Sequence, residues 1–148
     1  MGSVLMVDDE PLKIKYYREA LDEAGFEVTY HPTVDGADRF LDEAMKKSQA
    51  PDAITLDMGM PCGFIFTPKE TGDCMQTGLA LYRRMREVHH YTGPVVVLTF
   101  LALPDVQAYF QKQPNCVLTS PVETKPDDLV AIIQRMCAPG SSLARDSS

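Results

Sequence analysis

The sequence contains no tryptophan and no segment long and apolar enough for a membrane-spanning helix, and its first residues lead us to expect no secretory leader. Its four cysteines, at positions 62, 74, 116 and 137, form no Cys-x-x-Cys pair, so a zinc site of that kind is not indicated. Cysteines without an evident pairing, together with eight methionines, are typical of a reducing compartment. We therefore expect a cytoplasmic protein that does not span a membrane.

Positive charge is also scarce, with 14 lysines and arginines against 21 aspartates and glutamates and a net charge of −7. An acidic surface repels nucleic-acid phosphates and anionic lipids, so direct binding to nucleic acid or membrane is disfavoured. The 148 residues suffice for one domain with a substantial core. A hydrophobic content of 45% and a charged content of 24% are ordinary for a globular protein, which excludes a disordered chain, a collagen-like repeat and a coiled coil.

Short apolar runs alternate with amphipathic segments along the chain. The runs at 4–7, 53–56 and 95–98 are continuous, as in strands buried on both faces, whereas 26–30 alternates like an edge strand. A fifth strand is predicted at 116–118, and helices at about 11–24, 37–47, 81–88, 104–110 and 127–136. Five successive strand–helix pairs predict an α/β fold, with a parallel sheet, right-handed crossovers and helices on both faces.

Two segments lack this periodicity. Residues 58–77 are rich in glycine and proline and are predicted to form a loop. Residues 138–148 are rich in serine, glycine, proline and alanine and are predicted to be a disordered tail or linker stub. Residues 1–137 then form a single folded domain.

Polar residues follow the predicted strands directly. Asp8 and Asp9 come after the first strand, Asp57 after the third and Thr99 after the fourth. In a parallel sheet these positions share one edge, where ligands bind if the strand order reverses. Carboxylates brought together repel unless they hold protons or share a cation, and an all-oxygen set suits Mg²⁺. Each acid alone would read as a solvated loop residue or a helix cap, but together they predict phosphoryl transfer to an aspartate, assisted by Mg²⁺.

Three segments resemble the receiver domain of response regulators in two-component signal transduction. They are 4–10 (VLMVDDE), an apolar strand with its acidic pair; 56–61 (LDMGMP), the phosphoacceptor segment; and 95–99 (VVVLT), the strand that ends in the signalling threonine. The resemblance covers about residues 3–137. It implies a (βα)5 flavodoxin-like, CheY-like doubly wound fold with strand order 2-1-3-4-5.

The resemblance also implies a role for each site residue. Asp57 would accept a phosphoryl group from the phosphohistidine of a sensor histidine kinase or phosphotransfer protein. Asp8, Asp9, Asp57 and the backbone carbonyl of Gly59 would hold Mg²⁺. Thr99 would couple phosphorylation to the face formed by the last two helices and strand 116–118, for a downstream protein effector or a covalent output domain to read. Such a domain is a switch rather than an enzyme, beyond self-catalysed phosphotransfer and dephosphorylation, and a homodimer is left open.

The sequence departs from the receiver pattern at the end of the fifth strand. Receivers usually carry Lys-Pro there, whereas this chain has Ser120-Pro121, and its Lys125-Pro126 lies five residues later. We favour Ser120 as the replacement, over a shifted loop that lets Lys125 reach back. A serine offers a hydrogen bond but no charge, and a lost charge-assisted contact is worth about 1.5–3 kcal/mol. Val117 stands where an aromatic residue is usual, so the alternative is an interaction module that works without phosphate.

A second departure is an insertion at about 62–76, between the third strand and the third predicted helix. Gly78 matches the glycine that receivers place closer to the phosphoacceptor, so about a dozen residues are extra. Such a loop is either a tolerated surface insertion or a lid or partner-specific loop, in which Lys69 could supply the missing positive charge. Cys62 and Cys74 bracket the loop, but a disulfide between them is disfavoured in a reducing compartment.

Overall fold

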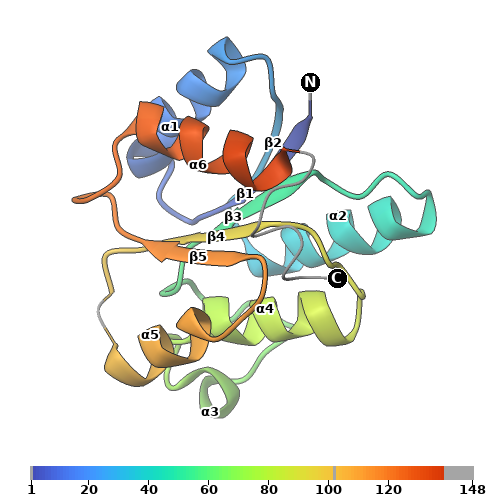
Figure 1. Cartoon of the computed structure of the whole chain (residues 1–148). Coiled ribbons are helices and arrows are strands. Elements are labelled where there is room, and N and C mark those ends of the chain that lie inside the picture. Colours follow the sequence, from blue (N-terminus) through green and yellow to red (C-terminus); the bar gives the residue numbers. More distant parts are fainter. Residues whose placement is uncertain (1, 102, 139–148) are drawn as a thin grey trace.

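The computed structural model describes residues 2–101 and 103–138, which form one five-stranded sheet with helices on both faces (Figure 1). All strand pairs are parallel, and the strand order is β2-β1-β3-β4-β5. This order confirms the predicted α/β fold with strand order 2-1-3-4-5. The strands are β1 (Ser3–Val7), β2 (Glu27–His31), β3 (Ala53–Leu56), β4 (Val95–Leu98) and β5 (Cys116–Thr119).

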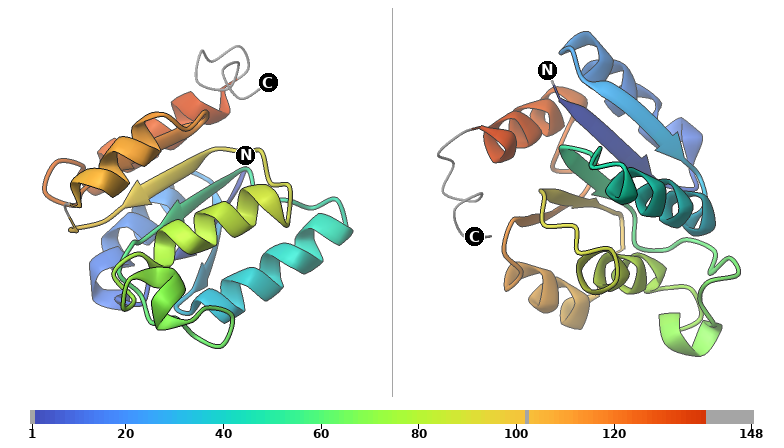
Figure 2. Two further views of the ribbon diagram at one scale, coloured as in Figure 1. Left: turned by 90° about the horizontal axis from the view of Figure 1, so that it is seen from below. Right: turned by 90° about the vertical axis from the view of Figure 1, so that its right-hand side faces the viewer.

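Two helix layers cover the sheet, as the two further views show (Figure 2). Helices α1 and α6 lie on one face, and α2, α4 and α5 lie on the other (Figure 1). A sixth, very short helix, α3, packs against α4 on its outer side. The helices are α1 (Pro11–Glu23), α2 (Val34–Lys46), α3 (Pro68–Thr71), α4 (Thr77–Glu87), α5 (Pro104–Gln111) and α6 (Pro126–Cys137).

The central strand β1 shows why the sheet needs both layers. Its side chains alternate, so that Val4 and Met6 pack against α1 and α6 while Leu5 and Val7 pack against α2, α4 and α5. All four side chains are buried. A run of consecutive apolar residues therefore forms a strand only when each face has its own helical cover.

The loop predicted over 58–77 is wrong for residues 68–71, which form α3. A helix of four residues is too short for an apolar periodicity, but its end signals are present in the sequence. The Thr67 hydroxyl accepts a hydrogen bond from the N–H of Glu70, and the Glu70 carboxylate accepts from the N–H of Thr67. Gly72 ends the helix in the left-handed conformation, with φ of 58°.

The predicted tail at 138–148 lies outside the described residues, apart from its first residue. Among the helices within 2–101 and 103–138, none is long and apolar enough to cross a membrane. From β1, the chain adds β2 on one side of the sheet and then β3, β4 and β5 on the other side. The strand order therefore reverses between the neighbouring strands β1 and β3. A crevice therefore opens beyond the carboxyl ends of these two strands.

Candidate functional site

Strand register places the predicted acids side by side. Val7 of β1 lies opposite Leu56 of β3, so Asp8 and Asp57, the next residue of each strand, emerge together at the same edge. Carboxylate oxygens of these two and of Asp9 and Glu10 all lie within 4.8 Å of one another. Asp8 and Asp57 are only 3% and 5% exposed, whereas Glu10 lies in solvent.

Backbone donors hold the two buried carboxylates in place. Oδ1 of Asp8 accepts a hydrogen bond from the N–H of Glu10 at 2.9 Å, and Oδ1 of Asp57 accepts one from the N–H of Met58 at 2.7 Å. The Tyr30 hydroxyl donates to the backbone carbonyl of Asp8 at 2.7 Å. These bonds orient the carboxylates before any ligand arrives, which lowers the cost of binding one.

A lysine completes the cluster, although the sequence reasoning did not single it out. Nζ of Lys13 lies 2.8 Å from Oδ2 of Asp8 and 3.3 Å from Oδ1 of Asp57. It also donates to the backbone carbonyl of Leu98 at 3.1 Å. A signal was present, because Lys13 stands four residues before Tyr17 and so shares the buried face of α1.

Burial controls the protonation of Asp8. Removal from water raises the pKa of its carboxyl from 3.8 to about 6, although the nearby Lys13 ammonium works in the opposite direction. One positive charge therefore does not offset the desolvation of this acid. The negative charge that remains on the cluster therefore favours the binding of a further cation.

The acidic cluster lines one side of an open cleft of about 660 Å³. Thr99, at the end of β4 and 4% exposed, lies across from it, and its Oγ accepts a hydrogen bond from the N–H of Leu101 at 3.2 Å. The insertion supplies part of the wall through Asp73, Cys74 and Met75. The other lining residues are Asp9, Glu10, Asp57, Gly59, Met60, Pro61, Phe100 and Leu101.

The donor set fits a hard divalent cation. Carboxylates that converge within 4.8 Å, beside the backbone of Gly59 in the cleft wall, are oxygen ligands of the kind that Mg²⁺ prefers. Asp9 and Asp57 both line the open cleft, so a cation could reach them from solvent with part of its water shell. Asp8 lies behind them and adds negative charge to the site.

A family model described as the response regulator receiver domain matches residues 4–134. The chain belongs to this family. The match covers β1 from its second residue, the other four strands in full and most of α6, which is close to the region that the sequence motifs predict. No curated protein sequence matches the chain.

Solved receiver structures share the fold of this receiver. A CheY-like receiver domain protein from Methanospirillum hungatei JF-1 has a TM-score of 0.68 at 14% identity, covering 93% of this chain and 94% of its own. The signal receiver domain of a histidine kinase from Syntrophus aciditrophicus has a TM-score of 0.68 at 23% identity, with 96% and 94% covered. The BeF3-activated receiver domain of Nitrogen Regulatory Protein C has a TM-score of 0.58 at 26% identity, with 91% and 93% covered.

Among the described residues, those expected to replace the strand-five lysine make no ion pair with the acidic cluster of this receiver. The Ser120 hydroxyl accepts a hydrogen bond from the N–H of Glu123 at 3.3 Å and lines a cavity beside α5 that shares Thr99, Phe100 and Leu101 with the acidic cleft. Lys125 is exposed at the start of α6, where its N–H donates to the carboxylate of Asp128. Lys69 is exposed on α3. Within 2–101 and 103–138, neither lysine makes an ion pair with the cluster.

Val117 occupies the position on β5 where receivers usually carry an aromatic residue. Val117 packs against the layer of α1 and α6. Its neighbours Cys116 and Leu118 pack against the opposite layer, on the side of α5. The side of β5 that faces α5 therefore carries no aromatic residue in this receiver.

A disulfide joins Cys62 and Cys74, so the expectation of unpaired cysteines is wrong for these two. Helix α3 folds the insertion back on itself and brings the two Cα atoms to 5.6 Å, a distance that suits a disulfide. The sequence could not show this return, because residues 62 and 74 are 12 apart and only the fold of α3 brings them together. Cys116 and Cys137 are free.

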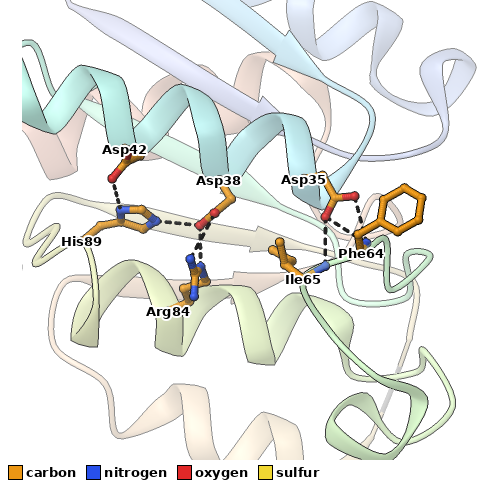
Figure 3. A network of polar contacts seen from close by, with 7 residues as sticks. All are labelled: Asp35, Asp38, Asp42, Phe64, Ile65, Arg84 and His89. Atoms are coloured by element: carbon orange, nitrogen blue, oxygen red, sulfur yellow. Dashed lines mark hydrogen bonds and ion pairs between the residues drawn. The ribbon is translucent and has the colours of Figure 1, made fainter.

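Polar contacts attach the insertion and α4 to α2 (Figure 3). The Asp35 carboxylate accepts hydrogen bonds from the N–H groups of Phe64 and Ile65, so the start of α2 holds the insertion. One turn later, Oδ1 of Asp38 lies 2.6 Å from both Arg84 Nε and His89 Nε2. Burial alone would raise the pKa of Asp38, but the hydrogen bonds from Arg84 and His89 outweigh it and hold the pKa below its ordinary value.

Proposed function

We propose that this chain is a phosphorylatable receiver in which Asp57 accepts a phosphoryl group. The observation that carries the proposal is the buried Asp57 carboxylate at the floor of an open cleft, within a cluster of acids and across from Thr99. A carboxylate in this position combines access for a phosphodonor with a site for a charge-neutralising cation. A cluster of buried acids has no evident structural benefit, because each buried charge costs solvation energy.

The chemistry assigns different tasks to the two oxygens of Asp57. Among the described residues, both contacts to its carboxylate, from Met58 N–H and Lys13 Nζ, fall on Oδ1. Oδ2 is then the oxygen for bond formation. It attacks the phosphorus of a phosphohistidine, the P–N bond breaks as the P–O bond forms, and the electron pair returns to the imidazole nitrogen. The product is an acyl phosphate on Asp57 and a histidine on the donor.

Mg²⁺ would neutralise charge on the carboxylates and phosphoryl oxygens when bound by Asp8, Asp9, Asp57 and the Gly59 carbonyl. Thr99 would bind the phosphoryl group from the other side. Its Oγ already accepts from the N–H of Leu101, which leaves the hydroxyl proton free to donate to a phosphoryl oxygen.

A shift of Thr99 would pass to the surface formed by α5, β5 and α6. Thr99 directly follows β4, which pairs with β5, and α5 packs on β5. We propose that a sensor histidine kinase or phosphotransfer protein phosphorylates this receiver in the cytoplasm, and that a protein effector or output domain reads the surface. This location is proposed from the receiver family, because the Cys62–Cys74 disulfide removes the argument from unpaired cysteines. The chain acts as a switch, not as an enzyme that turns over a substrate.

A second candidate function is a protein-interaction module that works without phosphate. The chemistry of Ser120 favours it, because its hydroxyl bonds to the N–H of Glu123 and brings no positive charge to the end of β5. On this hypothesis the surface of α5, β5 and α6 is permanently in its binding conformation. The two functions differ in whether Asp57 carries a phosphoryl group.

Intact mass after incubation with Mg²⁺ and acetyl phosphate separates the two functions. The wild-type chain is expected to gain the mass of one phosphoryl group, and Asp57→Asn to gain none. Asp22→Asn, which removes an exposed carboxylate from α1, is the matched control and is expected to behave as wild type. An adduct that persists in Asp57→Asn, or a wild-type chain that gains no mass, would contradict phosphorylation at this site.

A further inference from the structure

We infer that Lys13 is the cation that binds the phosphoryl group on Asp57, so that helix α1 supplies the positive charge of the site. The inference rests on the proposed function and deepens it. Its basis is the position of the Lys13 ammonium, between the ends of three strands and 3.3 Å from Oδ1 of the phosphoacceptor.

The contacts of Lys13 place its charge at the reaction centre. Its side chain is 7% exposed, and Nζ contacts Oδ2 of Asp8, Oδ1 of Asp57 and the backbone carbonyl of Leu98. Three partners match the three N–H donors of an ammonium group. The Phe100 ring lies near it, with its centroid 5.5 Å from Nζ. A lysine buried with all donors used is held in one place, unlike a surface lysine that samples many rotamers.

The local sequence places the Lys13 side chain beside the acidic cleft. Pro11 begins α1 directly after the acidic segment, so the first turn of the helix lies beside the carboxylates. Ile14, Tyr17 and Leu21 form the buried face of α1, and Lys13 lies on the edge of that face nearest the acids. Lys15, two residues later, lies in solvent.

Phosphorylation would strengthen the electrostatic attraction between Asp57 and the Lys13 ammonium. An acyl phosphate on Asp57 replaces a single carboxylate charge with a dianionic group, which attracts a fixed cation more strongly. Nζ is already within reach of Asp57 Oδ1 and bonds to the residue that precedes Thr99. Lys13 thus contacts the nucleophile and the backbone of the residue that precedes Thr99, whose hydroxyl would bind the other side of the phosphoryl group.

Other lysines near the cleft do not compete for this role. Within 2–101 and 103–138, the ion pairs of Asp8 and Asp57 are both made by Lys13. Lys125 and Lys69 are exposed on α6 and α3, as described above. The charge that Ser120 does not provide is therefore present in the site, on a different element.

Lys13 contacts two of the proposed Mg²⁺ ligands, so its effects on metal binding and on phosphoryl binding are distinguished by their opposite directions. Its ion pairs are with Asp8 and Asp57, whereas Asp9 lines the open cleft without one. Removal of the ammonium leaves the carboxylates more negative, which favours a divalent cation and disfavours an anion. A phosphoryl-binding lysine therefore predicts opposite changes in the affinities for Mg²⁺ and for a phosphoryl mimic.

The test compares Lys13→Met and Lys13→Gln, which both remove the charge, with Lys15→Met as the matched control on the same helix. Calorimetry measures Mg²⁺ affinity first, and then the affinity for beryllofluoride at saturating Mg²⁺. We expect both Lys13 variants to bind beryllofluoride at least about tenfold more weakly and to be phosphorylated by acetyl phosphate more slowly. Their Mg²⁺ affinity is expected to equal or exceed that of wild type, and Lys15→Met to match wild type throughout.

The outcomes distinguish this inference from the proposed function. If wild type binds beryllofluoride and both Lys13 variants bind it equally well, the inference is overturned while phosphorylation of Asp57 stands. If wild type neither binds beryllofluoride nor gains a phosphoryl group, both are overturned. Lys13→Gln retains hydrogen-bond donors and so guards against a folding defect in Lys13→Met, which thermal unfolding of each variant detects.

Discussion

Asp8 is a carboxylate almost fully removed from solvent, and its ionisation opposes folding. The pKa of about 6 in the folded chain exceeds the ordinary value of 3.8, because burial outweighs the ion pair with Lys13. An acid with a raised pKa contributes stability that is fully present below about pH 4 and is lost as the pH rises through about 6. At neutral pH the ionised Asp8 carboxylate therefore lowers the stability of the folded chain until a cation binds.

We predict that Asp8→Asn is more stable than wild type at pH 7.5 without Mg²⁺. The gain is expected to be about 1–2 kcal/mol, or a few °C in Tm, because asparagine does not ionise. The gap should narrow as the pH falls from 7 to 4, since Asp8 is then protonated in wild type. Thermal unfolding across this range measures it. A gap that does not change with pH, or a less stable variant, would show that the ion pair with Lys13 outweighs burial.

At the scale of elements, helix α4 meets the end of β3 at Gly78. A Cβ built on Gly78 would overlap the backbone carbonyl oxygen of Asp57, and the N–H of Gly78 donates to the carbonyl of Met58 at 2.8 Å. The obstructing atoms are backbone, so they cannot rotate away. This close approach sets the path of the chain that leaves the phosphoacceptor.

We predict that Gly78→Ala costs about 2–3 kcal/mol in the free energy of unfolding, because helix and strand must separate. Gly36→Ala in α2 is the matched control, since its Cβ would meet side-chain atoms of His31 and Thr33 that can adjust. Alanine also favours the helix there, so we expect a small effect of either sign. Urea unfolding of both variants measures the difference. Equal stabilities would mean that α4 does not pack tightly on the phosphoacceptor segment.

The insertion is a second feature at this scale, because its two ends are joined to each other and its first part is attached to α2. The disulfide from Cys62 to Cys74 closes it, and Asp35 at the start of α2 holds the backbone of Phe64 and Ile65. Its far end contributes to the wall of the acidic cleft. The segment is therefore a structured part of the site's surroundings rather than an extended surface loop.

For the whole molecule, the acidic cleft concentrates charge in a chain that already carries a net charge of −7. Four acids have carboxylate oxygens within 4.8 Å, and one lysine contacts two of them. A divalent cation that binds only the folded state stabilises that state by mass action.

We predict that Mg²⁺ raises the Tm of the wild-type chain. When the Mg²⁺ concentration is 100 times the Kd, binding adds about 2.7 kcal/mol to the free energy of unfolding. The shift should fall strongly in Asp9→Asn, which removes a carboxylate at the open cleft. Asp105→Asn on α5 serves as the control for a general effect of charge. An equal shift in all three chains would assign the effect to ionic screening and not to the cleft.

The sequence by itself determined the five strand–helix pairs, the parallel sheet and the acids at its carboxyl edge. Apolar periodicity is a local property, and a residue that follows a buried strand must lie at the strand's end wherever the strand is packed. The placement of Asp8, Asp57 and Thr99 could therefore be anticipated from the order of residues alone.

Only the tertiary structure decided which distant groups complete the site. Lys13 meets the carbonyl of Leu98 across 85 residues of sequence, and Arg84 meets Asp38 across 46. The return of the chain that joins Cys62 to Cys74 likewise depends on α3. A long side chain can reach several neighbours, and its choice depends on which elements pack together, because a buried charge must find whatever partner the fold places within reach.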